Sequence, residues 1–492
     1  MLTPDYYFNC TDDIVELYSK LDQSITKDIA RRIVKAGYVT EGAKWQIQVE
    51  RDAGLLYDDI ISTIAEYTET SESAVKALFE DAGITSKDFD DTIYKEAGKK
   101  PIPLKSSPAM LQVLLAGIEK TNGHLSNLTK TTALSAQTAF IDACALAEME
   151  ITSGAFDYNA AIKHAVDSAI SHGCYVEYAS GARATLEAAV RRAVMTGVSQ
   201  TTGEISLANA KELGTDLMEI TAHGGARPSH AVWQGRIVCI SGKRSGYLTL
   251  SDIGYGEVTG FKGVNCRHDW YPYVEGVSTL AHTKQELEDL KNATVTYDGK
   301  EIPLYEAQQK QRAMERLIRD ERRKALGYEE AAKSATNNKL KEDLETEYYT
   351  YAQKIKQKEK IYESYCRETG LTPQKERLYK FGYNKSASQK VSIANNEAKK
   401  YDELIGINTK TGVSLSEVGI HIKSRALARQ ISMENIKDAL TNPLKLGKIR
   451  TNKSQQYIGE KATVVINTET GKLITVWPTS EKKAKKLLEK SE

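Results

Sequence analysis

Three residues near the C-terminus, His421, Arg425 and Arg429, could act on a phosphodiester. They are four residues apart, so on a helix one imidazole and two guanidinium groups project along the same face. Near pH 7 a neutral imidazole can accept the proton of a ribose 2′-hydroxyl, while guanidinium groups hold the phosphate and offset the charge of the transition state. The same spacing also fits a solvated basic helix face, and spacing alone favours that simpler interpretation.

A second group of candidate residues lies in the middle of the chain and consists of His223, His230, Cys266 and His268. These are ligand types that a tetrahedral zinc ion accepts. Their spacing, H-x6-H followed by C-x-H, matches no standard zinc-finger pattern. The alternative is a loop-rich module whose imidazoles hydrogen-bond to backbone carbonyls with help from Arg227 and Arg267. We favour this alternative and expect no cofactor, with zinc kept as a secondary hypothesis.

The elements around His421 are the easiest to predict. A helix around 424–430 is followed by Ser432, a good N-cap, and a second helix ends at Asn442-Pro443. Apolar or β-branched runs then predict strands, and the turn Thr468-Glu469-Thr470-Gly471 predicts a hairpin. The strands are expected at 444–450, 462–467 and 472–477, and a closing basic helix at 482–488. This order predicts a small α+β domain.

The rest of the chain reads as helices with one α+β module, so we predict a mainly α protein with α+β modules. Pro101 and Pro103 mark a break. The clearest helical periodicity begins at Leu186. A charged stretch with apolar steps of three, four or seven predicts a long helical hairpin, hinged near Gly327. The expected domains are 1–100, helical; 101–280, a core with the His/Cys module at 220–275; 281–366, the hairpin; 367–410, a linker; and 411–492, the small domain.

Composition separates the last domain from the rest. The chain has 492 residues, 40 % of them hydrophobic, enough for several cores. Residues 405–492 carry 16 Lys+Arg against 8 Asp+Glu, which gives this segment a net charge of +8. Since the whole chain has a net charge of +1, the remaining residues have a net charge of −7. Only the tail is suited to a polyanion. The six scattered cysteines indicate reduced thiols, and the absence of a long apolar stretch or a signal-like start predicts no membrane partner and a cytoplasmic protein.

Two motifs in the body carry a resemblance to a known family. His223-Gly-Gly-Ala-Arg227-Pro-Ser-His230-Ala-Val-Trp233-Gln-Gly235 is followed by Gly263-Val-Asn265-Cys266-Arg267-His268. Together with the later segment 305–319, they resemble phage minor capsid protein 2 over roughly residues 1–365 and, more distantly, Mu-type minor head proteins. The resemblance implies a non-enzymatic virion component of the phage head, with portal and capsid proteins as partners, assembled in the bacterial host cytoplasm.

The C-terminal domain resembles a different family, the polymorphic toxin type 50 domain, which belongs to the barnase/EndoU/colicin/RelE class of metal-independent ribonucleases. The resemblance implies that His421, Arg425 and Arg429, and also Ser454, Tyr457 and Thr475, are catalytic. Since the domain has no second histidine, a two-histidine relay is excluded. The general acid would then be Lys423, Tyr457 or water, or the leaving group would depart with the help of an arginine alone. The residues that carry the resemblance are His421, Arg425, Arg429, 431–432, 442–444, 454–455, 457–459, 462–467, 470–471 and Thr475.

Basic residues of this domain suit phosphate contacts, and such binding weakens with salt. Trp477 and Tyr457 could stack on bases, although a Trp in an apolar strand is more often core. The partners would be RNA and an immunity protein. The RNA-binding candidates are Lys423, Lys445, Lys448, Arg450 and Lys453, with Lys482, Lys483, Lys485 and Lys486 as further basic residues.

Three hypotheses about function follow. The first is a phage minor capsid protein that carries a ribonuclease toxin domain. The second keeps the virion role but has the basic domain bind nucleic acid without cleaving it. The third, a bacterial contact-dependent toxin, is weakened because no export signal is visible.

Overall fold

A computed structural model gives the fold, and it describes residues 1–489 apart from 37–41, 174, 179, 375–377 and 379–383. Most of these residues are helical, and the strands form small sheets. This confirms the predicted class, mainly α with α+β modules. Of the six cysteines, Cys174 lies outside the described residues, and the other five are free thiols, as predicted.

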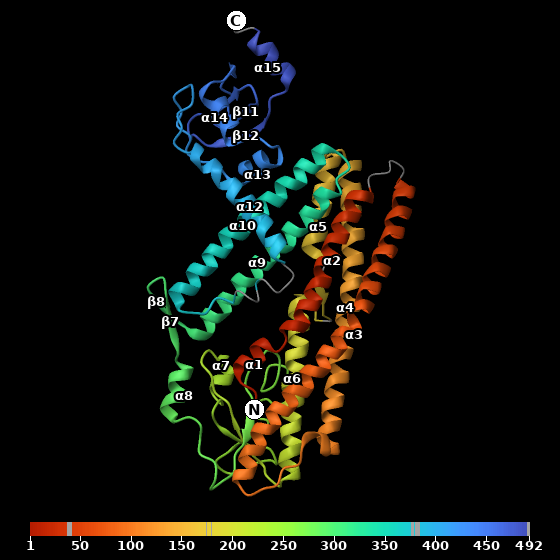
Figure 1. Ribbon diagram of the computed structural model, residues 1–492, viewed down its shortest axis with the longest axis vertical. Helices are drawn as coiled ribbons and strands as arrows, with labels where there is room; N and C mark the ends of the chain where they lie inside the picture. The colour runs from red at the N-terminus through yellow and green to blue at the C-terminus, as the bar shows by residue number, and fades with distance from the viewer. Residues whose placement is uncertain (37–41, 174, 179, 375–377, 379–383, 490–492) are drawn as a thin grey trace.

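Long helices form the body of the molecule and run side by side along its long axis (Figure 1). They are amphipathic: α2, for example, buries Ile14, Leu21, Ile25 and Ile29 in a core shared by all of them. The body helices are α1 (Pro4–Asn9), α2 (Asp12–Ala36), α3 (Gly42–Glu96), the short 3-10 helix η1 (Leu104–Ser106), α4 (Pro108–Thr152), α5 (Tyr158–His172) and α6 (Leu186–Glu212), with a small hairpin of β1 (Tyr175–Glu177) and β2 (Arg183–Thr185) before α6.

The predicted break at Pro101 and Pro103 is confirmed, since α3 ends at Glu96 and α4 begins at Pro108. The side chain of Ser107 caps α4 by accepting a hydrogen bond from the Met110 N–H. The two helices then pack against each other, so the break is a turn within the shared core.

The predicted module of loops and short strands at 220–275 is also present. It has a four-stranded sheet in the order β5-β4-β3-β6 and its own apolar cluster, which includes Trp233, Phe261 and Trp270. A capped helix and a β-hairpin lead from it into the next helix. The elements are β3 (Leu217–Ile220), α7 (Pro228–Ala231), β4 (Ile237–Cys239), β5 (Leu248–Thr249), β6 (Trp270–Pro272), α8 (Lys284–Lys291), β7 (Thr294–Tyr297) and β8 (Lys300–Pro303).

The long charged hairpin is formed by α9 (Leu304–Lys333) and α10 (Asn338–Thr369). The prediction of a hinge near Gly327 is wrong, because Gly327 lies inside α9 and the chain turns between Ser334 and Asn337. The glycine serves packing instead: a Cβ there would lie 2.4 Å from Ile170 Cδ1 of α5. Its missing side chain lets α9 approach the body closely.

The stretch 367–410, expected to be a linker, contains ordered elements where it is described. Helix α12 (Lys385–Lys400) packs on α10 and buries Val391 and Ala394 in the body core. The short 3-10 helix η2 (Tyr401–Leu404) follows and contributes to the core of the C-terminal domain. This part of the stretch is therefore built into the fold.

The C-terminal domain has its own core and lies at the end of the molecule opposite the α7 module (Figure 1). The predicted helices and hairpin are present, and Ser432 caps its helix by accepting from the Asn435 N–H. Strand β10 was not among the predicted strands. The sheet order is β12-β11-β10-β9, all antiparallel. The elements are α13 (Ile420–Ala428), α14 (Met433–Thr441), β9 (Lys445–Leu446), β10 (Ser454–Ile458), β11 (Ala462–Asn467), β12 (Leu473–Pro478) and α15 (Glu481–Leu488).

Candidate functional site

Helix α13 positions the C-terminal candidates because two of its faces are buried. Ile422 and Ala426 enter the core of the C-terminal domain. Ser424 is turned toward α10, where its hydroxyl hydrogen-bonds with Thr350 Oγ1 and Gln353 Nε2, both at 2.9 Å. The residues left at the remaining edge are His421, Arg425 and Arg429, as the four-residue spacing predicts.

His421, Arg425 and Thr475 form a continuous polar group. Arg425 NH2 lies 2.9 Å from His421 Nε2, and Arg425 NH1 donates to Thr475 Oγ1 at 3.0 Å. The arginine thus joins the start of α13 to strand β12 at the edge of the sheet. Because a guanidinium only donates, Nε2 must accept, and the ring proton is on Nδ1. The group offers a neutral imidazole, a cation and a hydroxyl at one place.

Arg429 lies on the same side of α13 but is held by other partners. Its NH1 donates to the Val476 carbonyl at 2.9 Å, and its Nε pairs with Glu342 Oε2 of α10 at 3.3 Å. Glu342 belongs to the helical hairpin. Arg429, the third of the predicted residues, therefore contacts the body and not His421.

Burial lowers the pKa of His421 below its usual value, and the positive charges of Arg425, Lys163 and Arg429 lower it further, while Glu347 opposes them. The ring is consequently neutral at pH 7 although its residue is exposed. A neutral imidazole is the form that a general base requires.

Two of the expected catalytic residues are not part of this group. Tyr457 is fully buried, and its hydroxyl contacts Thr411 and Thr409 and donates to Gln455 Oε1 at 3.2 Å. Ser454 is buried and donates to Asn452 Oδ1 at 2.7 Å. Both are on β10, two strands from β12, so the expectation that they line the same site as His421 is wrong. Their hydroxyls stabilise the interior of the domain.

The basic candidates of the β9 edge also lie apart from His421. Lys445, Lys448 and Arg450 are exposed along β9 and the loop after it, at the opposite sheet edge from β12. With strands about 4.8 Å apart, three spacings separate these edges by roughly 14 Å. Lys423 is paired with Asp402, and Lys453 with Glu469 at 3.2 Å. The basic residues of the β9 edge and the group around His421 therefore form two separate surfaces, while Lys423 shares α13 with His421. The basic residues Lys482, Lys483, Lys485 and Lys486 lie on α15.

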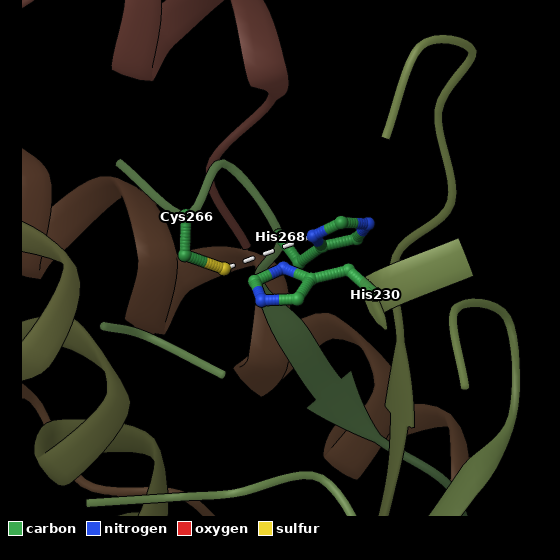
Figure 2. A group of neighbouring side chains, drawn as sticks. All are labelled: His230, Cys266 and His268. Atoms are coloured by element: carbon green, nitrogen blue, oxygen red, sulfur yellow. Dashed lines mark hydrogen bonds between the residues drawn. The ribbon is translucent and has the colours of Figure 1, made fainter. Parts of the chain in front are cut away.

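The central candidates come together around the start of α7 and the loop before β6. Figure 2 shows His230, Cys266 and His268 turned toward one another. Cys266 Sγ is 3.7 Å from His268 Nδ1, and one ligand atom from each of the three lies within 4.8 Å of the others. His223 does not join this group; its ring stacks on His268, with centroids 4.4 Å apart. The structure thus unites three of the four predicted residues.

The imidazoles also hydrogen-bond to carbonyl oxygens, as the favoured interpretation predicts. His223 Nδ1 is 3.0 Å from Gly224 O, and His230 Nε2 is 2.8 Å from Thr259 O. Arg227 donates to the carbonyls of Thr259 and Val264. The third ring differs, because the partner of His268 Nε2 is a side chain, Gln234 Oε1, at 3.1 Å. Arg267 reaches Gln308 of α9 at 3.3 Å, outside this network.

The loop that carries Cys266 and His268 is pinned by a buried ion pair. Lys262 and Asp269 are both almost completely buried, and their charged groups contact each other. Asp269 Oδ2 also accepts from the Leu2 N–H at 2.5 Å, which ties this loop to the residues that precede α1. Within the loop, a Cβ on Gly263 would lie 2.5 Å from the Val258 carbonyl oxygen, so only glycine fits.

Burial keeps the central imidazoles neutral. It lowers the pKa of His223 to about 4, assisted by Arg267, and it lowers the pKa of His230. The pKa of His268 is well below its usual value for the same reason, and the neighbouring His223 and His230 add to the effect. Burial raises the pKa of the Cys266 thiol.

Sequence reasoning missed Gln234, Thr259, Lys262 and Asp269 as parts of this site. Gln234 stands in the motif after Trp233, so its position was visible, but its role was not. Thr259 acts through its backbone carbonyl, which no side-chain pattern reveals. A buried ion pair reads in the sequence like two surface charges.

With this geometry described, the comparisons with known proteins assign the body. Residues 2–365 match the model of the family Phage minor capsid protein 2. A "Structural protein" of Lactococcus phage LL-H is 25 % identical over 334 residues, which cover 64 % of this chain and 85 % of that protein. A "Structural protein" of Lactococcus phage mv4 is 35 % identical over 111 residues, 22 % of this chain and 77 % of that protein. No solved structure matches.

The helical body with its His/Cys module therefore defines a phage structural protein. The chain belongs to the phage minor capsid protein 2 family, so it is a virion component that assembles with other capsid components. The family match ends at residue 365, within α10, and does not include the C-terminal domain. None of the described helices is long and apolar enough to cross a membrane.

Proposed function

We propose that the C-terminal domain of this capsid protein is a metal-independent ribonuclease, with His421 as its general base. The observation that carries the proposal is the contact of His421 Nε2 with Arg425, which also donates to Thr475. When an RNA phosphate accepts the hydrogen bonds of the Arg425 guanidinium, His421 Nε2 loses its contact with Arg425. It can then accept the proton of the 2′-hydroxyl. The exposed position of His421 and its lowered pKa support this role.

The structure narrows the choice of general acid. Lys423 is paired with Asp402, and Tyr457 is fully buried, so neither supports protonation of the leaving group. Of the expected alternatives, water remains, and so does departure of the leaving group with the help of an arginine alone. Arg425 would stabilise the phosphate charge in the transition state, and Thr475 would orient Arg425.

The test is cleavage of labelled RNA in EDTA, with the full chain and with a fragment beginning at residue 385, which retains α12 and the separate core of the domain. We expect cleavage by the wild-type fragment and a loss of roughly 10²–10⁴-fold in His421→Ala. In the full chain, His282→Ala is the matched histidine control, since His282 lies before α8 and outside both clusters; the 385–492 fragment does not contain it. Undiminished cleavage by His421→Ala would exclude the role of His421, and intact RNA with the wild-type fragment would exclude the ribonuclease.

A producing cell would need protection from such an activity, either an immunity protein or latency. The contacts of α13 with α10 support latency, because Glu342 holds Arg429 and the hydroxyl network of Ser424 fixes the helix against the body. On this proposal the full chain cleaves RNA more slowly than the fragment. The bacterial host cytoplasm during assembly is where that difference would matter.

A second candidate function, nucleic-acid binding without cleavage, is favoured by a different observation. Lys445, Lys448 and Arg450 are exposed together at the β9 edge, in a region of net charge +8. Such a surface neutralises phosphates, and its affinity falls steeply with salt. A shifted but intact RNA band, lost in Lys448→Glu/Arg450→Glu and retained in Lys482→Glu/Lys483→Glu, would favour binding alone.

For the body we propose a position next to the portal. Membership of a minor capsid family supports this placement, and so does the net charge of −7 outside the basic tail, which suits contact with other proteins better than with nucleic acid. Cross-linking of intact virions followed by mass spectrometry should join body residues to the portal protein. Cross-links confined to the major shell would contradict the proposal.

A further inference from the structure

We infer that His230, Cys266 and His268 bind a zinc ion. The three residues come from two segments, the start of α7 and the loop before β6, which the fold brings together (Figure 2). Their ligand atoms all lie within 4.8 Å of one another, and Cys266 Sγ is 3.7 Å from His268 Nδ1. Around tetrahedral zinc, with bonds of about 2.0–2.3 Å, neighbouring ligand atoms lie roughly 3.3–3.8 Å apart.

The hydrogen bonds of the His230 and His268 imidazoles leave one nitrogen of each ring able to bind a metal. His230 Nε2 faces the Thr259 carbonyl oxygen, and His268 Nε2 faces Gln234 Oε1. Because both oxygens only accept, each Nε2 carries the proton and each Nδ1 keeps a lone pair. Metal-bound histidines are held in this way by their second nitrogen. The carbonyl contacts favoured by the sequence are therefore compatible with a metal.

The three residues are buried, and a polar atom beside them has no hydrogen-bond partner among the described residues. His230, Cys266 and His268 are each 3 % exposed or less, and Trp233 packs against both imidazoles. Gln234 is also buried, and its Nε2 has no hydrogen-bond partner among the described residues. Buried polar atoms of this kind commonly accompany a bound ion or its water. Three protein ligands leave the fourth position of the zinc to water.

The charge of a bound zinc ion would be partly balanced by the thiolate that Cys266 forms when the ion binds. Binding releases the Cys266 thiol proton to solvent, so the zinc–thiolate unit adds a single positive charge. The ion pair of Lys262 with Asp269 is neutral overall, whereas the positive charges of Arg227 and Arg267 also act on His268, so the thiolate of Cys266 supplies the negative charge at the ion. Soft thiolate and imidazole ligands select zinc over magnesium or calcium. The ion would fasten the motif around His230 to the loop 263–268.

The experiment measures the metal content of the full-length chain, purified without chelator from zinc-supplemented medium. We expect about one zinc per chain, and at least tenfold less in Cys266→Ser and His268→Gln. The matched control is Cys239→Ser, which removes another buried thiol of the same module and should retain zinc. Gln234→Leu should weaken zinc affinity by roughly 10–100-fold, because it removes the oxygen that orients His268.

A second measurement covers the case in which the Cys266 variant does not fold. Wild-type protein exchanged into Co²⁺ should show a thiolate-to-cobalt charge-transfer band and the visible absorption of a tetrahedral site, and zinc should abolish both. A zinc-free wild-type protein without these cobalt bands would overturn the inference, as would zinc binding that survives in a folded Cys266→Ser variant. Neither result depends on whether the C-terminal domain cleaves RNA.

Discussion

The two histidine clusters of this protein lie in different parts of the molecule, one at α7 and the other at α13 (Figure 1), and they differ in what surrounds them. His230 and His268 are buried within the part that matches the capsid family, and their Nε2 atoms face oxygens that hold the rings in place. His421 is exposed, outside that match, and its Nε2 faces an arginine. On our two proposals, the same side chain would bind a metal in the α7 module and accept a proton in the C-terminal domain.

The regions that carry the clusters also differ in how they are held. The body is joined by close apolar packing, and the contact of Gly327 in α9 with Ile170 in α5 leaves no space for a methyl group. The C-terminal domain has its own core and meets α10 partly through the hydroxyls of Thr350 and Ser424 and the pair Glu342–Arg429. Polar contacts of this kind are weaker and easier to reverse. The difference suits a permanent body with a separable domain.

The largest effect is expected at the ion pair that pins the central loop. Asp269→Ala leaves Lys262 buried without its partner, so the free energy of unfolding should fall by about 3–5 kcal/mol. Chemical denaturation of the full chain measures this. Lys262→Met/Asp269→Leu should recover much of the loss, and a single-variant loss below about 1 kcal/mol would contradict the assigned role.

The pair also predicts a pH dependence. Burial alone would raise the pKa of Asp269, but the ammonium groups of Lys262 and the N-terminus lower it below its usual value. Its stabilising contribution is therefore complete above the ordinary carboxyl pKa of about 3.9 and is lost as the pH falls below that value.

The next effect concerns the exposed cluster. Because His421 must be neutral to act as a base and its pKa is lowered below 6.5, cleavage should be independent of pH around neutrality. Below the pKa it should fall about tenfold per pH unit. The profile of kcat/KM for the full chain measures this, because the body residues Lys163 and Glu347 also act on the pKa of His421. A fall of kcat/KM with a midpoint above pH 7 would mean that a group other than His421 titrates, which would contradict the prediction.

A smaller effect is expected within the body core. Gly327→Ala places a methyl group against Ile170, and such overpacking costs about 1–3 kcal/mol, partly offset by the better helix propensity of alanine. Gly54→Ala in α3 is the matched control, since a Cβ there meets nothing within 4 Å and should be neutral or stabilising. Equal stability of the two variants would show that α5 and α9 are not closely packed.

The smallest effect is expected at the contact between the regions. Glu342→Ala removes the exposed partner of Arg429 and should change overall stability by less than about 1 kcal/mol. If the contact keeps the domain latent, RNA cleavage by the full chain should nevertheless rise toward that of the fragment. Lys339→Ala, which breaks a surface pair of the same helix with Asp157, is the control and should leave cleavage unchanged.

Much of the fold could be predicted from local sequence. Periodicity located the long helices, the two prolines located the turn between α3 and α4, and Ser432 located the start of α14. Local patterns failed where the structure depends on distant partners. Strand β10, Ser454–Ile458, begins with three polar residues, and it is a strand because β9 and β11 pair with it on both sides.

For the candidate sites, the sequence by itself determined the residue types and the alignment of His421, Arg425 and Arg429, because helical spacing is a local property. Only the tertiary structure decided that Thr475 joins His421 and Arg425, that Ser454 and Tyr457 do not, and that Glu342 engages Arg429. It likewise placed His223 against the ring of His268 and outside the group of ligand atoms formed by the other three central residues. Distances between segments depend on how whole elements pack, and no local pattern of residues encodes them.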